Sequence, residues 1–375
     1  MLHLNYGGLE KQTITLINEL AKIQEYEIEI VSVYDLLNGK SFYEINPRVK
    51  ISFLADFGPH HQAFYDALHN FKLIKLIKES FIMIKCGIYK TRVLKKCIKN
   101  LNTDIIVSSR IEFSRLINRK DTLNISQEHS YIATPKYIKK VRKCFKNIDD
   151  VVVMTEKAKK EYELWLDKSN SNAKVYNISN MIDKKEDEDI ANFSNKEIIS
   201  VGRLEKVKDF PTLIDVFNLV HKEMPDIKLK LVGEGSQREV IEERIRKYNL
   251  ESSVTITGRI TSEEVKNELK KASVFVLSSV CESFSLVLCE AMECGLPVFS
   301  FNIEVGPKEI IKDGYNGFLV RDRDINEMSQ KIIDILNDEE KWKYISSNAL
   351  QDVEKYHSEN VAKLWLDLIE RGKEV

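Results

Sequence analysis

The sequence has few cysteines, and their spacing marks neither a disulfide-rich protein nor a zinc site. Its 375 residues include six cysteines, and no two of them form a CxxC pair. Disulfide frameworks and structural zinc sites both depend on close, regular cysteine spacing. We therefore expect no metal site, no disulfide framework and no bound cofactor, in a reducing, cytoplasmic setting.

The sequence also lacks a recognisable signal peptide and a membrane-spanning stretch. The first residues, MLHLNYGG, do not combine a basic segment with a long apolar run. The most apolar helical stretch, residues 71–89, is interrupted by lysine every few residues. It cannot supply the uninterrupted run of about 20 apolar residues that crosses a bilayer. Any membrane contact is therefore expected to be peripheral, at the inner face of the plasma membrane.

Charge of one sign is not in excess over the whole chain, because the formal net charge is −1. The charges are nevertheless unevenly distributed, since residues 51–150 hold 19 Lys and Arg against nine Asp and Glu. Two interpretations of this basic region remain open: solvated helix faces, or attraction to an anionic bilayer or a phosphate-bearing acceptor. We expect no nucleic-acid partner.

Residues 71–85 predict a helix with an apolar face inside this basic region. The face holds Leu73, Ile74, Ile77, Phe81 and Ile84. Lys72 and Lys75 lie opposite it, and Lys78 and Lys85 lie at its border. Such a helix either packs into a core or lies on a membrane.

Short β-branched segments alternate with amphipathic stretches along almost the whole chain. This alternation predicts α/β domains with parallel sheets covered on both faces. The strand candidates are residues 1–5, 28–34, 104–109, 151–155, 198–202, 228–233, 274–279 and 297–301. At about 150 residues per domain, the length suggests two domains. Charge rises and apolar content falls over 180–197, so we predict domains at 1–180 and 190–355, with a C-terminal helix at 356–375.

Ligands of open parallel sheets bind beyond the carboxyl ends of the strands, so the strand-to-helix junctions are the candidate sites. Gly7 and Gly8 follow the first strand candidate, where backbone amides can approach a ligand closely. Gly233 and Gly235 precede another helix, but a third glycine of the dinucleotide fingerprint is missing. Each glycine pair is weak evidence, because a turn alone explains it.

Two further junctions carry charged side chains. Arg203 and Lys208 follow the strand candidate at 198–202 and offer two positive charges for a diphosphate, or else ordinary surface salt bridges. Glu282 and Glu290 surround the turn after the strand candidate at 274–279. The helix that starts there presents free amides to an anion. Carboxylates would repel that anion, so sugar hydroxyls are their natural partners, unless both are simply exposed acids near a helix start.

The segments VGRLEKVKDFPTLI, LVGEGS and ESFSLVLCEAMECGLPVFSFNIEVGPKEIIKDGYNGFLV resemble the donor-binding half of the family 4 retaining glycosyltransferases, also called group 1. The segment GGLEK is similar to the glycine turn of their first domain. The resemblance covers most of the chain and is strongest over 198–320. It implies the GT-B fold, in which two Rossmann-like domains face a central cleft and the C-terminal helix can pack back on the N-terminal domain.

The resemblance also implies roles for individual residues. Arg203 and Lys208 would bind the donor diphosphate, Glu282 the transferred sugar and Glu290 the nucleotide ribose. The turn whose backbone amides meet sugar and phosphate comprises Phe284, Ser285 and Leu286. Gly7 and Gly8 would close on the donor from the other domain. His129 lies where many members have a histidine near the reacting sugar or the acceptor, although a histidine there can also be a local hydrogen-bonding residue.

The turn departs from the family pattern, because Ser283 and Ser285 replace its two glycines. Serine keeps its backbone amide but adopts positive φ less readily. The geometry of this turn, and with it the choice of donor sugar, is therefore an open question.

The reaction that the resemblance implies is transfer of a hexose-type sugar, with retention, from a UDP-sugar or another nucleotide sugar to an acceptor hydroxyl. A glycan or lipid-linked acceptor in cell-surface polysaccharide or glycolipid synthesis would fit. A nucleotide-sugar epimerase and a non-catalytic sugar-nucleotide-binding protein are the alternatives. An epimerase would convert the donor without any acceptor, and a binding protein would release no nucleoside diphosphate.

Overall fold

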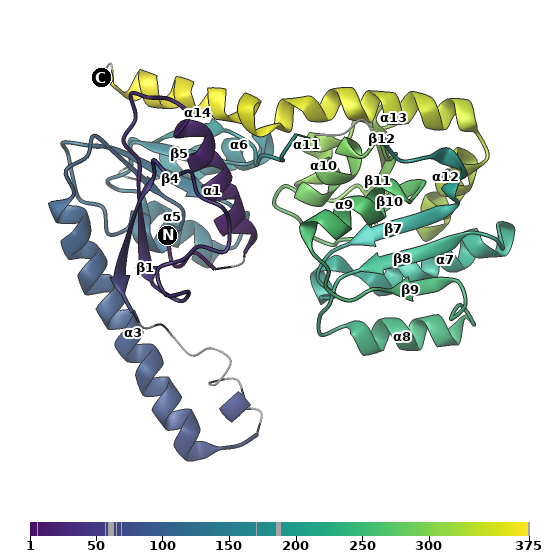
Figure 1. Cartoon of the computed structure of the whole chain (residues 1–375), viewed down its shortest axis with the longest axis horizontal. Helices are drawn as coiled ribbons and strands as arrows, with labels where there is room; N and C mark the ends of the chain where they lie inside the picture. Colours follow the sequence, from purple (N-terminus) through teal and green to yellow (C-terminus); the bar gives the residue numbers. More distant parts are fainter. Residues whose placement is uncertain are drawn as a thin grey trace. The chain divides into compact units, whose positions relative to one another are not determined.

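The structure is a computed structural model, and it describes residues 1–373 except 6, 57, 59–63, 65, 69, 170 and 185–188. The chain forms two compact units (Figure 1). Unit 1 comprises Met1–Ile178 with Ala362–Val375, and unit 2 comprises Ser179–Val361. Each unit is built on parallel β-sheet, which confirms the predicted α/β class.

Unit 2 contains a six-stranded parallel sheet in the order β12-β11-β10-β7-β8-β9. The strands are β7 (Glu197–Val201), β8 (Lys228–Val232), β9 (Val254–Ile256), β10 (Val274–Leu277), β11 (Val298–Phe301) and β12 (Gly317–Val320). After β7 the chain builds the sheet toward β8 and β9, and it then returns to place β10 on the other side of β7. The strand order therefore reverses between β7 and β10.

Helices cover both faces of this sheet (Figure 1). On one side α7 (Phe210–Glu223) packs with α8 (Arg238–Lys247) and α12 (Ile325–Leu336). On the other side α10 (Leu286–Glu293) packs with α9 (Ser262–Lys270) and α13 (Glu339–Val353). Because both faces are covered, every residue of β10 and β11 is buried. The short helices η1 (Phe193–Asn195), η2 (Lys206–Lys208), α11 (Pro307–Ile310) and η3 (Glu354–Tyr356) lie in the connections.

Unit 1 contains two parallel sheets. One has four strands in the order β3-β4-β5-β6: β3 (Ile105–Ser108), β4 (Leu123–Glu128), β5 (Asp150–Val153) and β6 (Lys174–Asn177). The other pairs β1 (Glu29–Tyr34) with β2 (Lys50–Ala55). Helices of this unit include α1 (Gly8–Leu20), α3 (Leu73–Asn100), α4 (Ile111–Ser114), α5 (Pro135–Cys144) and α6 (Glu156–Asp167). Thr134 and Thr155 begin α5 and α6 as side-chain caps, which is why these helices start where they do.

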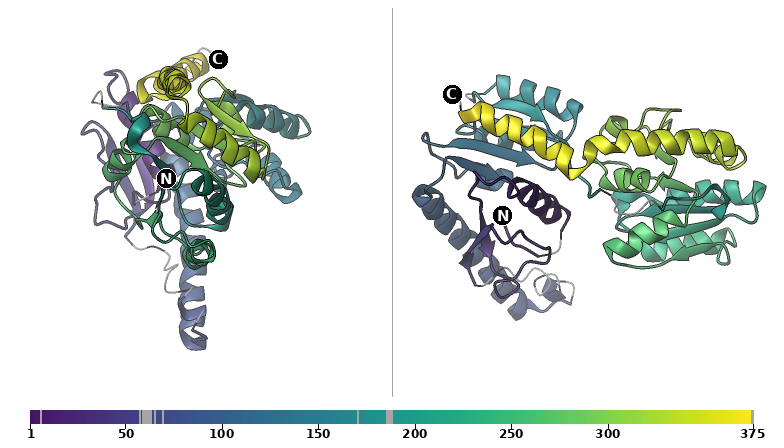
Figure 2. Two further views of the ribbon diagram at one scale, coloured as in Figure 1. Left: turned by 90° about the vertical axis from the view of Figure 1, so that its right-hand side faces the viewer. Right: turned by 45° about the horizontal axis from the view of Figure 1, so that its top comes forward.

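The helix α3 is the longest element, and its amino-terminal half extends away from the sheets of unit 1 (Figures 1 and 2). The final helix, α14 (Ser358–Lys373), buries Val361, Trp365 and Leu368. Leu364, which directly precedes Trp365, is exposed. No helix in the described ranges is long and apolar enough to cross a membrane.

Most predicted strands and helices are confirmed, and the exceptions have physical reasons. The strand predicted over residues 1–5 does not form, although the backbone N–H groups of Val33 and Tyr34 donate to the carbonyl oxygens of Met1 and Leu2. The prediction omitted β2, β6, β9 and β12. All four lie at an edge of their sheet, and β2, β6 and β9 each include an exposed residue. β12 has no exposed residue, but its apolar run is only the three residues 318–320.

Candidate active site

The predicted site residues of unit 2 follow the two strands at which the sheet changes direction. Arg203 and Lys208 come after β7, and Glu282 comes after β10. These strands are neighbours, and Val274 of β10 lies opposite Ile198 of β7. Loops leave the two carboxyl ends in opposite directions at such a reversal, which opens a ligand site between them. The topology therefore brings together two sequence motifs that are far apart in the chain.

An ion pair joins the two motifs directly. Lys208 Nζ lies 2.5 Å from Glu282 Oε1, and both side chains are largely buried, with 19% and 11% of their surface exposed. Ser279 Oγ donates a second hydrogen bond to Glu282 Oε1 at 2.6 Å. Ser278 Oγ donates to the backbone carbonyl of Lys208 at 2.7 Å. The cation and the carboxylate thus hold each other in place at the carboxyl edge of the sheet.

Sequence reasoning missed a third charged residue, Arg323. Its Nη1 donates to Asp209 Oδ2 at 2.8 Å and to the carbonyl oxygen of Ser278 at 2.7 Å, and its Nη2 donates to the carbonyl oxygen of Ser279 at 2.8 Å. Asp209 directly follows Lys208, so one guanidinium ties together the loops after β7 and β10. The charged run RDRD after β12 could have drawn attention to Arg323. The sequence does not, however, indicate the left-handed backbone of this residue, whose φ is 61°.

The loop that carries Arg203 is supported by the loop after β8. A side chain on Gly233 would place its Cβ 1.9 Å from the carbonyl oxygen of Gly202, so only glycine allows this close approach. Ser236 donates its N–H and its Oγ to the two carboxylate oxygens of Glu205, at 3.2 and 2.8 Å. The LVGEGS motif thus packs against the loop after β7 and holds it in place. Arg203 itself is exposed and, within the described part of the chain, has no side-chain hydrogen bond or ion pair.

The turn between β10 and α10 presents free backbone amides. Among the described residues, the N–H groups of Phe284, Ser285 and Leu286 have no hydrogen-bond partner. Ser285 is the N-cap residue of α10 and has a left-handed backbone, with φ 87°. Serine therefore adopts here the positive φ that a glycine in the family turn would adopt more readily. Across the turn, a Cβ on Gly306 would lie 2.8 Å from Glu282 Cβ. Free backbone amides at a helix start are the arrangement at which proteins commonly bind anions.

Glu290 lies on α10, eight residues after Glu282, and is half-buried. The structure therefore places seven of the predicted residues in unit 2, at or just beyond the carboxyl ends of β7 and β10. The other three, Gly7, Gly8 and His129, belong to unit 1.

In unit 1, Gly7 caps α1 and leaves room for a buried acid. A Cβ on Gly7 would lie 2.0 Å from Glu10 Oε2. The Oε1 atom of Glu10 lies 3.3 Å from Arg110 Nη2 and 3.7 Å from His3 Nδ1. Sequence reasoning missed this cluster, although GGLEK includes the acid. Gly8, by contrast, is exposed, and a side chain there would meet no other atom within 4 Å.

His129 directly follows β4 and is half-buried. The preceding residue, Glu128, is buried and accepts hydrogen bonds from Ser126 Oγ at 3.0 Å and from Tyr137 OH at 3.1 Å. Burial raises the pKa of Glu128 to about 7, despite these two hydrogen bonds. Sequence reasoning did not single out this carboxyl.

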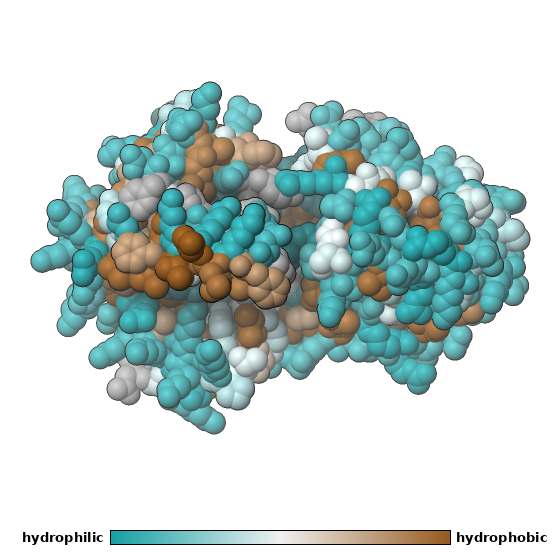
Figure 3. All heavy atoms as spheres, turned by 90° about the horizontal axis from the view of Figure 1, so that it is seen from below, coloured by the Kyte–Doolittle hydropathy of each residue, from teal (hydrophilic) through white to brown (hydrophobic). Residues whose placement is uncertain are grey.

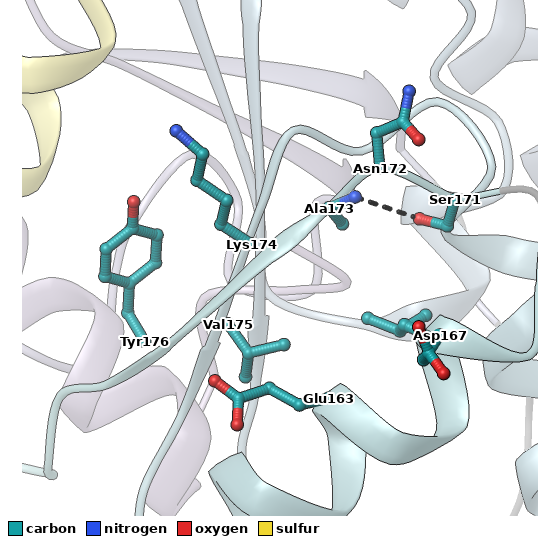
Figure 4. Close-up of a pocket in the computed structure, with 9 residues that line it drawn as sticks. Glu163, Asp167, Ser171, Asn172, Ala173, Lys174, Val175 and Tyr176 are labelled. Carbon is teal, nitrogen blue, oxygen red and sulfur yellow. Dashed lines mark hydrogen bonds between the residues drawn. The ribbon is translucent and has the colours of Figure 1, made fainter.

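A surface hollow in unit 1 lies apart from all the predicted residues (Figure 4). It lies between the end of α6 and the amino end of β6, and its lining includes Glu163, Asp167, Lys174 and Tyr176. A parallel sheet binds ligands at the carboxyl ends of its strands, and this hollow lies at the opposite end of the edge strand. It is therefore a weaker candidate than the edge at β7 and β10. No group of three or more His, Cys, Asp or Glu side chains in the described ranges could hold a metal ion.

Comparisons with known proteins agree with this geometry. The family model "Glycosyl transferases group 1" matches residues 182–352, the segment that carries the motifs after β7 and β10. An uncharacterized glycosyltransferase of Haemophilus influenzae is 28% identical over 97% of this chain and 96% of its own length. Residues 182–352 belong to the group 1 glycosyltransferase family. The predicted family and enzyme class are thereby confirmed.

Two further relatives of this glycosyltransferase have more specific names. AmsD of Erwinia amylovora, named for amylovoran biosynthesis, is 26% identical, over 97% of this chain and 96% of its own. A Campylobacter jejuni alpha-1,4-N-acetyl-D-galactosaminyltransferase is 27% identical, over 99% of this chain and 97% of its own length. Its full name includes a glycan attached to PP-undecaprenol.

Solved structures confirm the GT-B fold of this glycosyltransferase. Sucrose-phosphate synthase from Thermosynechococcus elongatus superposes with a TM-score of 0.73 over 98% of this chain and 94% of its own, at 19% identity. TarM of S. aureus, solved with UDP among its ligands, superposes with a TM-score of 0.65 over 74% of this chain and 58% of its own, at 24% identity.

Proposed function

We propose that this glycosyltransferase moves a hexose-type sugar from a nucleotide sugar to an acceptor hydroxyl, with retention of anomeric configuration. The observation that carries the proposal is the ion pair of Lys208 with Glu282 at the β7–β10 edge, where the loop with Arg203 and the turn with the free amides also begin. This edge offers cations and N–H donors for a diphosphate and a carboxylate for sugar hydroxyls. The surface hollow beside β6 also combines a lysine with acids, Lys174 with Glu163 and Asp167, but it lies at the end of α6 and not at a helix start.

The difficult step is departure of the nucleoside diphosphate. The bond from the anomeric carbon to the β-phosphate oxygen breaks, that oxygen takes the electron pair, and the sugar becomes cationic. Arg203, Lys208 and the amides of Phe284 to Leu286 would stabilise the negative charge that develops there. The acceptor oxygen then attacks the same face of the sugar, and its proton passes to the departing phosphate. Sugar, nucleoside diphosphate and proton are all accounted for without an enzyme nucleophile.

The remaining residues would bind the ends of the donor and the acceptor. We assign Glu282 to hydroxyls of the transferred sugar and Glu290 to those of the nucleotide ribose, because carboxylates accept strong hydrogen bonds from hydroxyls. We assign donor binding to the domain predicted at 190–355 and acceptor binding to the one at 1–180. Gly7, Gly8 and His129 would act from the latter on the donor and on the reacting sugar.

The names of the relatives suggest where to look for the substrates. AmsD is named for a polysaccharide, and the Campylobacter jejuni enzyme is named for a PP-undecaprenol glycan. We therefore propose a glycan or lipid-linked acceptor used in cell-surface polysaccharide or glycolipid synthesis, at the inner face of the plasma membrane. TarM was solved with UDP, so UDP-sugars are the first donors to test.

The test begins with a thermal-shift screen of the whole chain against UDP-, GDP- and ADP-sugars, because a ligand that binds the folded state raises Tm. The donor that binds is then incubated with and without candidate acceptors. We expect release of nucleoside diphosphate that depends on acceptor and a product that keeps the donor's anomeric configuration. An inverted product by NMR would contradict retention. Conversion of the donor alone into another sugar nucleotide would instead indicate an epimerase.

A further inference from the structure

We propose that the amino-terminal half of α3 binds the surface of an anionic lipid bilayer. Its apolar side chains point into solvent rather than into the core of unit 1, which excludes the core-packed interpretation of the sequence pattern. The exposed set is Leu73, Ile74, Ile77, Phe81, Ile84 and Ile88, and Ile74 and Phe81 expose 87% and 69% of their surface. Phe71, just before the helix, exposes 90%. Single exposed apolar residues are common on protein surfaces, whereas a contiguous exposed apolar patch indicates an interaction surface.

The exposed patch is separate from the side of α3 that packs on unit 1. Cys86 and Leu94 are buried and pack near Val33 and Tyr34 of β1. The exposed residues recur at steps of three and four along the helix, which places them in one stripe roughly opposite those two. A helix in a soluble domain needs one apolar face, and α3 has two. The second face therefore requires an apolar environment outside this unit.

Basic side chains border the exposed stripe. Lys78, Lys85 and Arg92 are exposed and seven residues apart, so they line one edge of it. Farther along the helix, Lys95 and Lys99 are exposed and continue the direction of the stripe. From Leu73 to Asn100 the helix holds eight Lys and Arg, and its one acid, Glu79, is buried. Apolar residues beside cations suit the boundary between lipid headgroups and acyl chains.

The positive charge of α3 favours a lipid bilayer over a second copy of this chain as the binding partner of the exposed stripe. Two copies of α3 packed through the exposed stripe would bring two rows of cations together, with no exposed acid on either helix to balance them. An anionic bilayer supplies both the opposite charge and the apolar depth. Seen from the end toward which α3 extends, hydrophobic atoms form a patch on unit 1 beside hydrophilic ones (Figure 3).

The experiment measures binding of the whole chain to vesicles, without donor or acceptor, so its outcome is independent of the proposed reaction. Vesicles of phosphatidylcholine alone are compared with vesicles containing about one-third phosphatidylglycerol. We expect binding that requires the anionic lipid. The triple variant Lys78→Gln, Lys85→Gln, Arg92→Gln should bind the anionic vesicles about 100-fold more weakly, at about fivefold per charge.

A matched control removes the same amount of charge elsewhere. Lys160, Lys222 and Arg246 are exposed on other helices, and changing all three to Gln should alter vesicle binding by no more than about twofold. Equal losses in both triple variants would overturn the proposal, because they would show that only net charge matters.

A second pair of variants tests the apolar stripe. Ile77→Ser with Phe81→Ser should weaken binding by about tenfold or more, since both side chains would leave the acyl boundary. Leu164→Ser, at an apolar residue of α6 that is 63% exposed, should leave binding unchanged. All five substituted sites of the two α3 variants are exposed, so the circular dichroism spectrum of each variant should match that of the parent. The proposal fails if the parent does not bind vesicles and light scattering shows a dimeric parent but a monomeric Ile77→Ser, Phe81→Ser variant. In that case the apolar face binds a second copy of the chain.

Discussion

The Nζ atom of Lys208 lies 2.5 Å from the Oε1 atom of Glu282, across the point where the strand order of unit 2 reverses. Most of both side chains is shielded from water, so the attraction is weakly screened and each group fixes the other. In the proposed reaction this pair would place a cation beside the leaving phosphate and a carboxylate beside the sugar. Pre-ordered charges of this kind act without having to reorganise during the reaction.

Lys208→Ala is expected to lower kcat by about 100-fold or more, because it removes a donor to the charge that develops in the transition state. The KM for the nucleotide sugar should change less than kcat if the interaction strengthens in the transition state. Steady-state kinetics with the donor identified by thermal shift measures both values.

Lys230 provides the matched control for this substitution. Its Nζ atom lies 2.8 Å from Glu197 Oε1 and 2.5 Å from Glu268 Oε2, and its side chain is as buried as that of Lys208. It lies on β8, away from the reversal of strand order. Lys230→Met should therefore lower the free energy of unfolding while leaving kcat nearly unchanged. Equal kcat losses in the two variants would mean that Lys208 acts only through stability.

Arg323 is expected to act as a positioning residue. Arg323→Ala would leave the carbonyl oxygens of Ser278 and Ser279 and the carboxylate of Asp209 without their shared donor. We expect a lower free energy of unfolding, by about 1–3 kcal/mol, and a kcat about tenfold lower with KM little changed. Arg323→Lys can keep one of the three bonds and should recover part of the kcat. Loss of stability with normal kcat in the folded enzyme would limit Arg323 to a structural role.

The sequence was sufficient to predict the parallel α/β fold, for identifiable reasons, but the ion pair between Lys208 and Glu282 was not predicted. The strands that flank Lys208 and Glu282 are buried on both faces, so they read as clear apolar runs, and their motifs directly follow. What could not be predicted was contact between residues far apart in the chain. The bonds from Arg323 to Ser278 and Ser279 depend on sheet order and on a left-handed backbone, neither of which leaves a local pattern.

The same limit applies to α3. Its periodicity predicted the helix correctly, but periodicity gives the direction of an apolar face and not what lies against it. Only the structure shows that Ile74 and Phe81 face solvent while Cys86 packs on β1. In unit 1 the Glu10–Arg110 pair was likewise not predictable, because the two residues are 100 positions apart in the chain.

Ser285 tests whether the turn before α10 has the left-handed backbone that the structure gives it. Glycine adopts φ near 87° without strain, whereas alanine does not. Ser285→Gly should therefore be more stable than Ser285→Ala by about 1 kcal/mol, as measured by urea denaturation. Both variants lose the hydroxyl, whose oxygen is buried without a hydrogen-bond partner among the described residues, so that loss cancels in the comparison. Equal stability of the two variants would contradict the left-handed conformation. Because both keep the backbone amide, the KM for the donor should stay within about threefold in Ser285→Gly.

Glu128 predicts how stability depends on pH. Its pKa is about 7 in the folded chain, compared with an ordinary value of 4.5. Between these values the folded chain holds a proton that the unfolded chain has released, so the free energy of unfolding falls as pH rises through this window. Below it both states are protonated, and above it both are ionised, so the buried charge exerts its full destabilisation above about pH 7.

Glu128→Gln removes the ionisation and keeps a side chain that can hydrogen-bond Ser126 and Tyr137. Urea denaturation should show the variant more stable than the parent at about pH 8, by up to about 3 kcal/mol, and little different at about pH 4.5. Asp150, whose burial raises its pKa to about 6, contributes a slope of the same sign to both proteins, so the difference between them isolates Glu128. A difference that does not vary with pH would mean that the pKa of Glu128 is the same in the folded and the unfolded chain, which would contradict the effect of burial.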